Sequence, residues 1–311
     1  MKKIFNLIAS FVLLTEFSAC NKDGSDKPDL PPAPVPTVNY KGLTFISSGN
    51  STVCLAKVGT PDEITLEYST DESQWNPYTI GEKISLADGT FLLFRAGDQK
   101  NLTFSKGSDS YYHFEISGPV TTQGNIMSLL DRDFSTPLST NAFFALFEGC
   151  KSLLSAPELP AKALAYNCYG RMFKGCSALT YVPDLPATEM RVYCYNNMFA
   201  NCTSLKFAPE LPATRLDMGC YHCMFEGCTS LTSAPELPAT ELVSNCYEFM
   251  YKDCRNLRYV IGLFTTEPSE KTTKDWLCGV AASGTFIKSK KATWDVTGAD
   301  GVPEGWKIET W

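Results

Sequence analysis

The sequence predicts an α+β protein: an N-terminal all-β sandwich followed by a short, curved solenoid with one strand and one helix per repeat. Short apolar runs of period two occupy residues 38–130, which is the pattern of half-buried strands. From residue 131 to 264 the same residue types return every 26 positions, and repeats of this length are typical of solenoids. With 311 residues, 44% of them hydrophobic, the chain is long enough for two hydrophobic cores.

Residues 1–19 have the order of a secretory signal peptide. Two lysines precede the apolar run from Ile4 to Leu14, and a small pair of residues stands directly before Cys20. The run is too short to span a bilayer as a stable helix. This segment resembles the lipobox of bacterial lipoproteins, and the resemblance implies that Cys20 is lipid-modified and anchors the mature chain. The alternative is plain secretion, with a cysteine at this place by chance.

Residues 20–37 form a predicted linker that is rich in Pro, Asp and Lys. Its prolines favour extended backbone, so we expect a stalk that holds the folded part away from a membrane. The acidic residues Asp23 and Asp26 resemble the stretch that accompanies transfer to the cell surface in lipoproteins of gut Bacteroidetes. We therefore expect an outer-membrane, lipid-anchored protein that is exposed on the cell surface.

The charge of the chain argues against nucleic acid as a partner. The formal net charge is −7, whereas proteins that bind nucleic acid neutralise its phosphates with clustered Lys and Arg. The one basic cluster, Lys288 to Lys291, is expected to be a solvated turn. We therefore expect no nucleic-acid partner, and the expected contact with a membrane is the lipid anchor at Cys20.

Residues 38–130 are predicted to form a sandwich of about seven to eight short strands. Turn residues, such as those at 87–89, separate the apolar runs. Four aromatic residues of this module could stack on a sugar: Trp75, Tyr78, Tyr111 and Tyr112. The alternative is that they fill the core of the sandwich, because buried aromatic side chains dominate β cores.

The repeat is visible in two columns of cysteines and in one recurring hexapeptide. Cysteines 26 residues apart form two series, namely Cys150, Cys176, Cys202, Cys228 and Cys254, and Cys168, Cys194, Cys220 and Cys246. The hexapeptide at 156–161 returns, with small changes, at 182–187, 208–213 and 234–239. Agreement at this many positions indicates one structural unit per 26 residues.

Each unit is predicted to contribute one short helix and one short strand. The apolar pairs Cys168-Tyr169 and Met172-Phe173 would cover an arc of about 140° on a helix, the width of an apolar stripe facing a core. Gly175 follows at a position where a left-handed residue can end the helix. A strand is expected near Leu179 and Val182. Because strands stack about 4.8 Å apart and helices need about 8 to 10 Å, the array should bend with its strands inside.

The repeat also resembles a known family. The segment Phe-Glu-Gly-Cys-Thr-Ser-Leu-Thr at 225–232 resembles the BspA-type leucine-rich repeats of bacterial surface proteins. The longer unit, with Ala-Pro-Glu-Leu-Pro-Ala-Thr-Glu-Leu at 234–242, is similar to a 26-residue variant of that family in Bacteroidetes lipoproteins. The resemblance implies a leucine-rich-repeat fold over most of the mature chain, and a role in adhesion or in binding host or matrix proteins.

The thirteen cysteines permit other interpretations. Disulfides are possible in an exported protein. Nine of the cysteines, however, stand in the two columns, where the need for a small buried hydrophobic side chain explains the choice of cysteine. A denser cluster that could hold zinc consists of Cys220, His222, Cys223 and Cys228. The adjacent residues His222 and Cys223 would point to different faces of the predicted helix, so we expect no metal and no cofactor.

No recognisable catalytic constellation stands in the sequence, so we expect no enzyme. Neither His113 nor His222 lies in a His-Glu-x-x-His pattern, and the sequence has no Gly-x-Ser-x-Gly turn and no phosphate-binding loop. Asp131 and Asp133 could form the carboxylate pair of a glycosidase. We interpret them instead as part of a solvated linker between the two domains.

The repeat predicts one binding surface. On each strand, the residue before the inward Ala or Val should point to the exposed concave face, and these residues are Ser155, Tyr181, Phe207, Ser233 and Tyr259. Exposed aromatic residues in a row are typical anchors for a protein or glycan partner. The alternative is that the aromatic members only stabilise the sheet through cross-strand contacts.

We therefore predict a non-catalytic cell-surface lipoprotein that captures an extracellular protein or glycan through its repeat array, in adhesion or partner capture. Residues 265–311 carry four tryptophans and are expected to cap the last repeat, since an open end would expose its core. The alternative function is an accessory lipoprotein of a nutrient-uptake system that captures glycans with its N-terminal β domain.

Overall fold

The computed structural model describes residue 40, residues 42–99 and residues 102–311. All of the described residues belong to one compact unit. The predicted signal peptide, the lipid-attachment residue Cys20 and the linker at 20–37 lie outside the described residues.

In the described part of the N-terminal module, alternating apolar side chains build nine strands around one core. These strands are β1 (Leu43–Ser47), β2 (Ser51–Val58), β3 (Leu66–Ser69), β4 (Asn76–Tyr78), β5 (Ile84–Leu86), β6 (Phe91–Ala96), β7 (Ser105–Gly107), β8 (Ser110–Ser117) and β9 (Val120–Gln123). They form one sheet in the order β10-β9-β1-β6-β3-β4, which includes a strand of the first repeat, and a second in the order β5-β2-β8-β7. The rings of Phe45 in β1 and Phe114 in β8 lie 4.8 Å apart between centroids, so the two sheets share a core.

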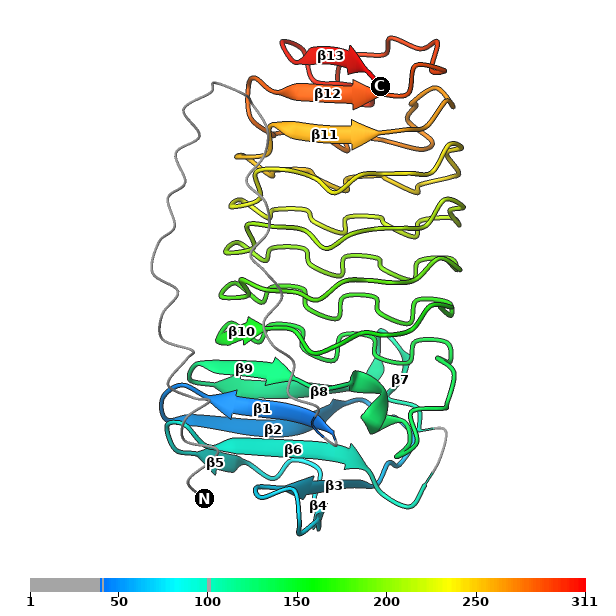
Figure 1. Cartoon of the computed structure of the whole chain (residues 1–311). Helices are drawn as coiled ribbons and strands as arrows, with labels where there is room; N and C mark the ends of the chain where they lie inside the picture. The colour runs from blue at the N-terminus through cyan, green and yellow to red at the C-terminus, as the bar shows by residue number, and fades with distance from the viewer. Residues whose placement is uncertain (1–39, 41, 100–101) are drawn as a thin grey trace. The chain divides into compact units, whose positions relative to one another are not determined.

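The first repeat continues the hydrogen bonding of this module. β10 (Leu153–Ser155) lies parallel to β9 in the six-stranded sheet (Figure 1). The Ser155 hydroxyl donates to the Thr122 carbonyl and accepts from the Thr122 N–H, at 3.0 Å in both cases. The Phe114 N–H of β8 donates to the Leu146 carbonyl at 2.7 Å. The module therefore covers the first coil through both of its sheets.

Each repeat forms one coil, and successive coils stack in register between β10 and β11 (Tyr259–Gly262) (Figure 1). The Tyr169 N–H donates to the Cys194 carbonyl, and 26 residues later the Tyr195 N–H donates to the Cys220 carbonyl, each at 3.0 Å. Parallel bridges link the coils on a second side, for example from Ser233 to its neighbours in both adjacent coils. The sequence period is therefore the length of one coil.

The predicted α+β class, with one helix per repeat, is wrong. Where a helix was expected, the backbone forms a succession of tight turns in which every fourth residue has a positive φ, as at Asn167 (50°), Arg171 (57°) and Gly175 (75°). Within this segment, backbone N–H groups donate alternately to a carbonyl of their own coil and to a carbonyl of the next coil. The Met172 N–H donates to the Tyr169 carbonyl in its own coil, and the Phe173 N–H donates to the Met198 carbonyl in the next. The only helical segment among the described residues is the 3-10 turn η1 (Ile126–Leu129).

The reason lies in the spacing of the coils. A helix needs about 8 to 10 Å to its neighbour, whereas hydrogen-bonded chains lie about 4.8 Å apart. Here both the strand side and the turn side of a coil bond directly to the next coil, so a helix would not fit. The predicted curvature rested on this difference in spacing between outer helices and inner strands. Without helices, that argument for a curved array no longer applies.

Two columns of stacked aromatic rings fill the interior of the coils. Tyr169, Tyr195, Tyr221 and Tyr247 follow one another with centroid distances of 5.8, 5.9 and 5.9 Å. A second column contains Phe147, Phe173, Phe199, Phe225 and Tyr251, spaced by 5.3 to 5.6 Å. Trp276 contacts the last ring of both columns. The residues that were predicted to form the apolar stripe of a helix thus do form the core, but the backbone that carries them is a succession of turns.

The C-terminal segment completes the stack with a parallel three-stranded sheet. β11 pairs with β12 (Thr285–Lys288), which pairs with β13 (Lys307–Thr310). Of the four tryptophans expected to close the array, Trp276, Trp294 and Trp306 are buried, whereas Trp311 is 62% exposed.

Candidate functional site

The five residues predicted to form the binding surface lie in one row across five coils. Backbone bridges join Ser155 to Tyr181, Phe207 to Ser233, and Ser233 to Tyr259. All five side chains are half-buried, while the next residue in each coil points inward, as Val182 and Val260 do. Strand alternation therefore directs the row to the outside, as the sequence indicated, although the array is not the helix-backed solenoid that was expected.

The aromatic members of this row, Tyr181, Phe207 and Tyr259, have no aromatic partner within the described residues. No ring contact involves them, in contrast to the stacked columns inside the coils. The hydroxyls of Tyr181 and Tyr259 make no hydrogen bond in the described part of the chain. Burial raises the pKa of Tyr181, and the carboxylates of Asp184 and Glu158 add to this effect. Within the described residues, this row therefore lacks the ring pairs that fill the inside of the coils.

Ser155 is the exception in the row. Its hydroxyl is already paired with both backbone groups of Thr122, so it joins the first coil to the N-terminal module. Its side chain thus has a structural role, and the outward groups available to a partner begin at Tyr181.

A second row, of acidic residues, runs beside the aromatic one. A carboxylate stands three residues after each of the first four row positions, and these residues are Glu158, Asp184, Glu210 and Glu236. Asp184 and Glu210 are exposed, and Glu158 and Glu236 are half-buried. This row was not predicted from the sequence, although the recurrence of an acid every 26 residues was the available signal of it.

We name the strand face as the surface made by the row from Ser155 to Tyr259 and the row from Glu158 to Glu236. No family model, curated protein or solved structure matches this chain. The resemblance to BspA-type repeats therefore stays a prediction that rests on the motif residues. No helix among residues 42–99 and 102–311 has the length and apolar character to span a bilayer.

The aromatic residues expected to stack on a sugar separate into two groups. Tyr78 and Tyr112 are buried, and their hydroxyls donate to the carbonyls of Glu82 (2.6 Å) and Asp62 (2.9 Å). These two belong to the core, as the alternative interpretation had it. Trp75 and Tyr111 are half-buried and reach the surface.

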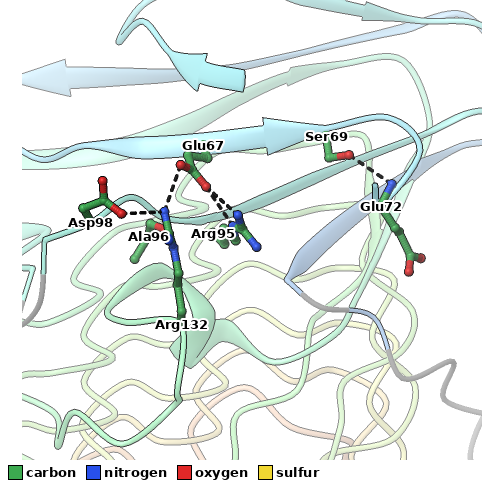
Figure 2. A network of polar contacts seen from close by, with 7 residues as sticks. All are labelled: Glu67, Ser69, Glu72, Arg95, Ala96, Asp98 and Arg132. Atoms are coloured by element: carbon green, nitrogen blue, oxygen red, sulfur yellow. Dashed lines mark hydrogen bonds and ion pairs between the residues drawn. The ribbon is translucent and has the colours of Figure 1, made fainter. Parts of the chain in front are cut away.

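A charged network occupies the sheet beside Trp75. The Arg95 guanidinium lies 3.8 Å from the centre of the Trp75 ring and bonds to Glu67 at 2.7 Å. Arg132, which follows η1, reaches the other oxygen of Glu67 at 2.9 Å and Asp98 at 3.1 Å (Figure 2). One face of the Trp75 ring is thus covered by Arg95, and the network ties the segment after η1 to β3 and β6.

Of the two carboxylates considered for glycosidase chemistry, Asp133 is exposed, as expected of a solvated linker, whereas Asp131 is not. Asp131 is buried, and its carboxylate accepts from the N–H groups of Asp133 (2.7 Å), Ser135 (3.2 Å) and Thr136 (2.5 Å). Burial alone would raise the pKa of Asp131, but the hydrogen bonds from the Thr136 side chain and from these N–H groups outweigh it, and the pKa is lowered. Asp131 therefore fixes the turn that leads into the first coil.

The twelve described cysteines are free, and eleven of them are buried. In the column that includes Cys202 and Cys228, each thiol donates to the carbonyl of an aromatic residue in the preceding coil, at 3.2 Å to Phe173 and 3.1 Å to Phe199. Burial raises the pKa of Cys228 to about 12, so the thiol keeps its proton. A small, buried side chain explains these positions, and the hydrogen bond adds a reason for sulfur.

The cysteine and histidine cluster considered for zinc does not converge. Cys220 and Cys228 are buried inside the coils, whereas His222 lies on the turn side, 3.6 Å from Glu248 and 3.9 Å from the Cys223 sulfur. No group of three or more His, Cys, Asp or Glu residues in the described ranges is arranged to hold a metal. The sequence argument, that His222 and Cys223 point to different faces of a helix, was wrong, because these residues do not lie in a helix.

The turn segments also carry a file of aromatic side chains that was not predicted from the sequence. Tyr166 contacts Tyr193, which contacts His222, which contacts Phe249, with centroid distances of 6.4, 6.4 and 5.9 Å. These residues do not recur at the 26-residue period, so a search for repeats could not find them. Unlike those of the strand face, these rings pack against one another.

Proposed function

We propose that this protein is a non-catalytic, lipid-anchored cell-surface protein that binds an extracellular partner through the strand face. The observation that carries the proposal is the row of Tyr181, Phe207 and Tyr259, whose rings lie half-exposed in one line without aromatic partners. Partly exposed aromatic side chains without aromatic partners are typical anchors of protein interfaces. The anchor at Cys20 and the position outside the cell remain part of the proposal.

The coils support this function by holding the row rigid. Hydrogen bonds join each coil to the next on two sides, and the stacked rings behind the row fix the spacing. A surface that is already ordered loses little conformational freedom when a partner binds. A long, pre-formed face therefore suits capture of an extended partner better than it suits chemistry on a small substrate.

The test is a triple variant, Tyr181→Ser, Phe207→Ser and Tyr259→Ser, compared with the wild type for capture of proteins from an array of extracellular matrix and host-surface proteins. The matched control is Tyr166→Ser, Tyr193→Ser and Phe249→Ser, which removes three aromatic side chains from the turn side. We expect the first variant to lose about 30-fold or more in affinity, because even one interface anchor contributes about 2 kcal/mol. Equal binding by the wild type and the strand-face variant would contradict the proposal.

A further inference from the structure

Among the residues that the structure describes, the acidic row of the strand face has no ion-pair partner. No hydrogen bond or ion pair within the described residues uses the carboxylates of Glu158, Asp184, Glu210 and Glu236. By contrast, Glu148 is paired with Arg171, and Glu67 with Arg95. The acidic row thus presents four consecutive unpaired charges.

Their arrangement adds to the mutual repulsion. Stacked chains lie about 4.8 Å apart, so neighbouring members of the row face each other across the ladder. Like charges directly opposite one another destabilise a sheet. The exposed bases on the other flank of the aromatic row, Lys206 and Arg258, occupy only two coils and do not bond to these carboxylates. A cation from outside the chain would relieve the repulsion along the whole row.

The aromatic row beside these carboxylates also favours a cationic side chain. An ammonium or guanidinium group is attracted to the face of a Tyr or Phe ring as well as to a carboxylate. Asp184 and Glu158 lie close enough to Tyr181 to raise the pKa of its hydroxyl, so both rows act on the same space. A basic side chain bound there would contact a ring and a carboxylate together.

We propose that the partner of the strand face is an extended, Lys- and Arg-rich segment of a protein. This inference rests on the proposed function and names the chemistry of its partner. The face has the length for such a segment, because its rows run over four to five successive coils. The net charge of −7 on the chain also attracts a positively charged segment over longer distances.

The experiment uses the full chain and a fluorescent peptide of alternating arginine and glycine, followed by anisotropy at low and high salt. The row variant is Glu158→Gln, Asp184→Asn, Glu210→Gln and Glu236→Gln. The control is Glu63→Gln, Asp88→Asn, Glu189→Gln and Glu241→Gln, which removes the same charge from exposed positions elsewhere. We expect the wild type and the control to bind the peptide, with an affinity that falls as salt rises. We expect the row variant to bind the peptide at least about tenfold more weakly than the wild type.

Two outcomes overturn the inference. Equal loss in the row variant and the control would mean that overall charge, and not the strand face, attracts the peptide. Unchanged binding by the row variant would remove the acidic row from any site. Either result leaves the proposed function intact if the Tyr181, Phe207 and Tyr259 variant still fails to capture the proteins on the array. Capture by that variant at the wild-type level would overturn the proposed function, whatever the peptide shows.

Discussion

Tyr251 stands where the preceding coils place phenylalanine. Its ring stacks on Phe225 at 5.6 Å, but its hydroxyl is buried and has no hydrogen-bond partner. The equivalent residues one to four coils earlier are Phe225, Phe199, Phe173 and Phe147. A buried polar group without a partner costs about 1–3 kcal/mol of stability. At this position the last coil of the array therefore carries a local defect that phenylalanine avoids in the earlier coils.

Replacing Tyr251 with Phe should raise the free energy of unfolding by about 1 kcal/mol or more, because the unpaired hydroxyl is removed and the ring stack is kept. Urea denaturation measures the change. Tyr221→Phe is the matched control, since its ring is stacked in the same way but its hydroxyl is not both buried and unpaired. A less stable Tyr251→Phe protein would show that the hydroxyl makes a bond after all.

The cysteines make a second prediction at this scale. Cys278 is exposed, whereas the other described cysteines are buried. Only the thiolate reacts with a maleimide, and burial raises the pKa of coil cysteines such as Cys228 to about 12. We expect a maleimide to modify Cys278 in the native protein and the coil cysteines only after unfolding, as mapped by mass spectrometry. Rapid labelling of Cys228 in the native state would contradict the closed stack, and Cys278→Ser serves as the control.

At the scale of the element, the turn segment explains why the sequence suggested a helix. Apolar pairs four residues apart, such as Cys168-Tyr169 and Met172-Phe173, fit a helix of 3.6 residues per turn and a ladder of four-residue turns equally well over so short a span. Positions of positive φ recur along the segment, at Asn167 and, two such turns later, at Gly175. Asn is also a favourable residue at the start of a helix, as an N-cap, so the residue type alone does not separate the two structures.

This ladder makes the glycine at its end sensitive. Gly175 has a φ of 75°, and Cβ at this position would meet no atom closer than 3.8 Å, so the cost of a side chain is conformational and not steric crowding by neighbours. We expect Gly175→Ala to lower the free energy of unfolding by about 1–2 kcal/mol. Lys151→Ala, at an exposed position, is the control and should change stability by less than about 0.5 kcal/mol. Equal effects on chemical denaturation would argue against the turn ladder.

The turn at Asp131 predicts a dependence on acid. Because the folded protein lowers the pKa of this carboxyl below its unfolded value of about 4, its stabilisation is complete above that value and is lost as pH falls through the lowered folded pKa. Asp131→Asn should be less stable at neutral pH and should lose less stability between about pH 5 and pH 2 than the wild type. Denaturation series at several pH values measure this. Identical pH profiles for the two proteins would exclude the hydrogen bonds as the cause.

At the scale of the whole molecule, the period of 26 residues and the outward row could be read from the sequence, because both depend on recurrence alone. What could not be read was the distance between coils, which is set by hydrogen bonds between residues in different repeats and decides between a helix and turns. The unpaired state of the acidic row, and the aromatic file from Tyr166 to Phe249, also depend on neighbours that only the stacked coils bring together.

The position of the molecule in the cell is tested by protease treatment of intact bacteria, read with an antibody to the coils. We expect the wild type to be digested from outside and Cys20→Ala to be released from the membrane fraction. A wild type that stays protected until the outer membrane is opened would contradict surface exposure. It would also remove any partner outside the cell from consideration.

Within the described residues, each inner coil forms its hydrogen bonds to other coils only with the coil before it and the coil after it. The gene can therefore change this protein by whole units, because duplication of one 26-residue segment adds a coil without disturbing the register of the others. Each duplication would lengthen the strand face by about 4.8 Å and add one row residue and one acid. Variation in copy number would thus tune reach and charge together, in fixed steps, while both ends of the stack stay capped.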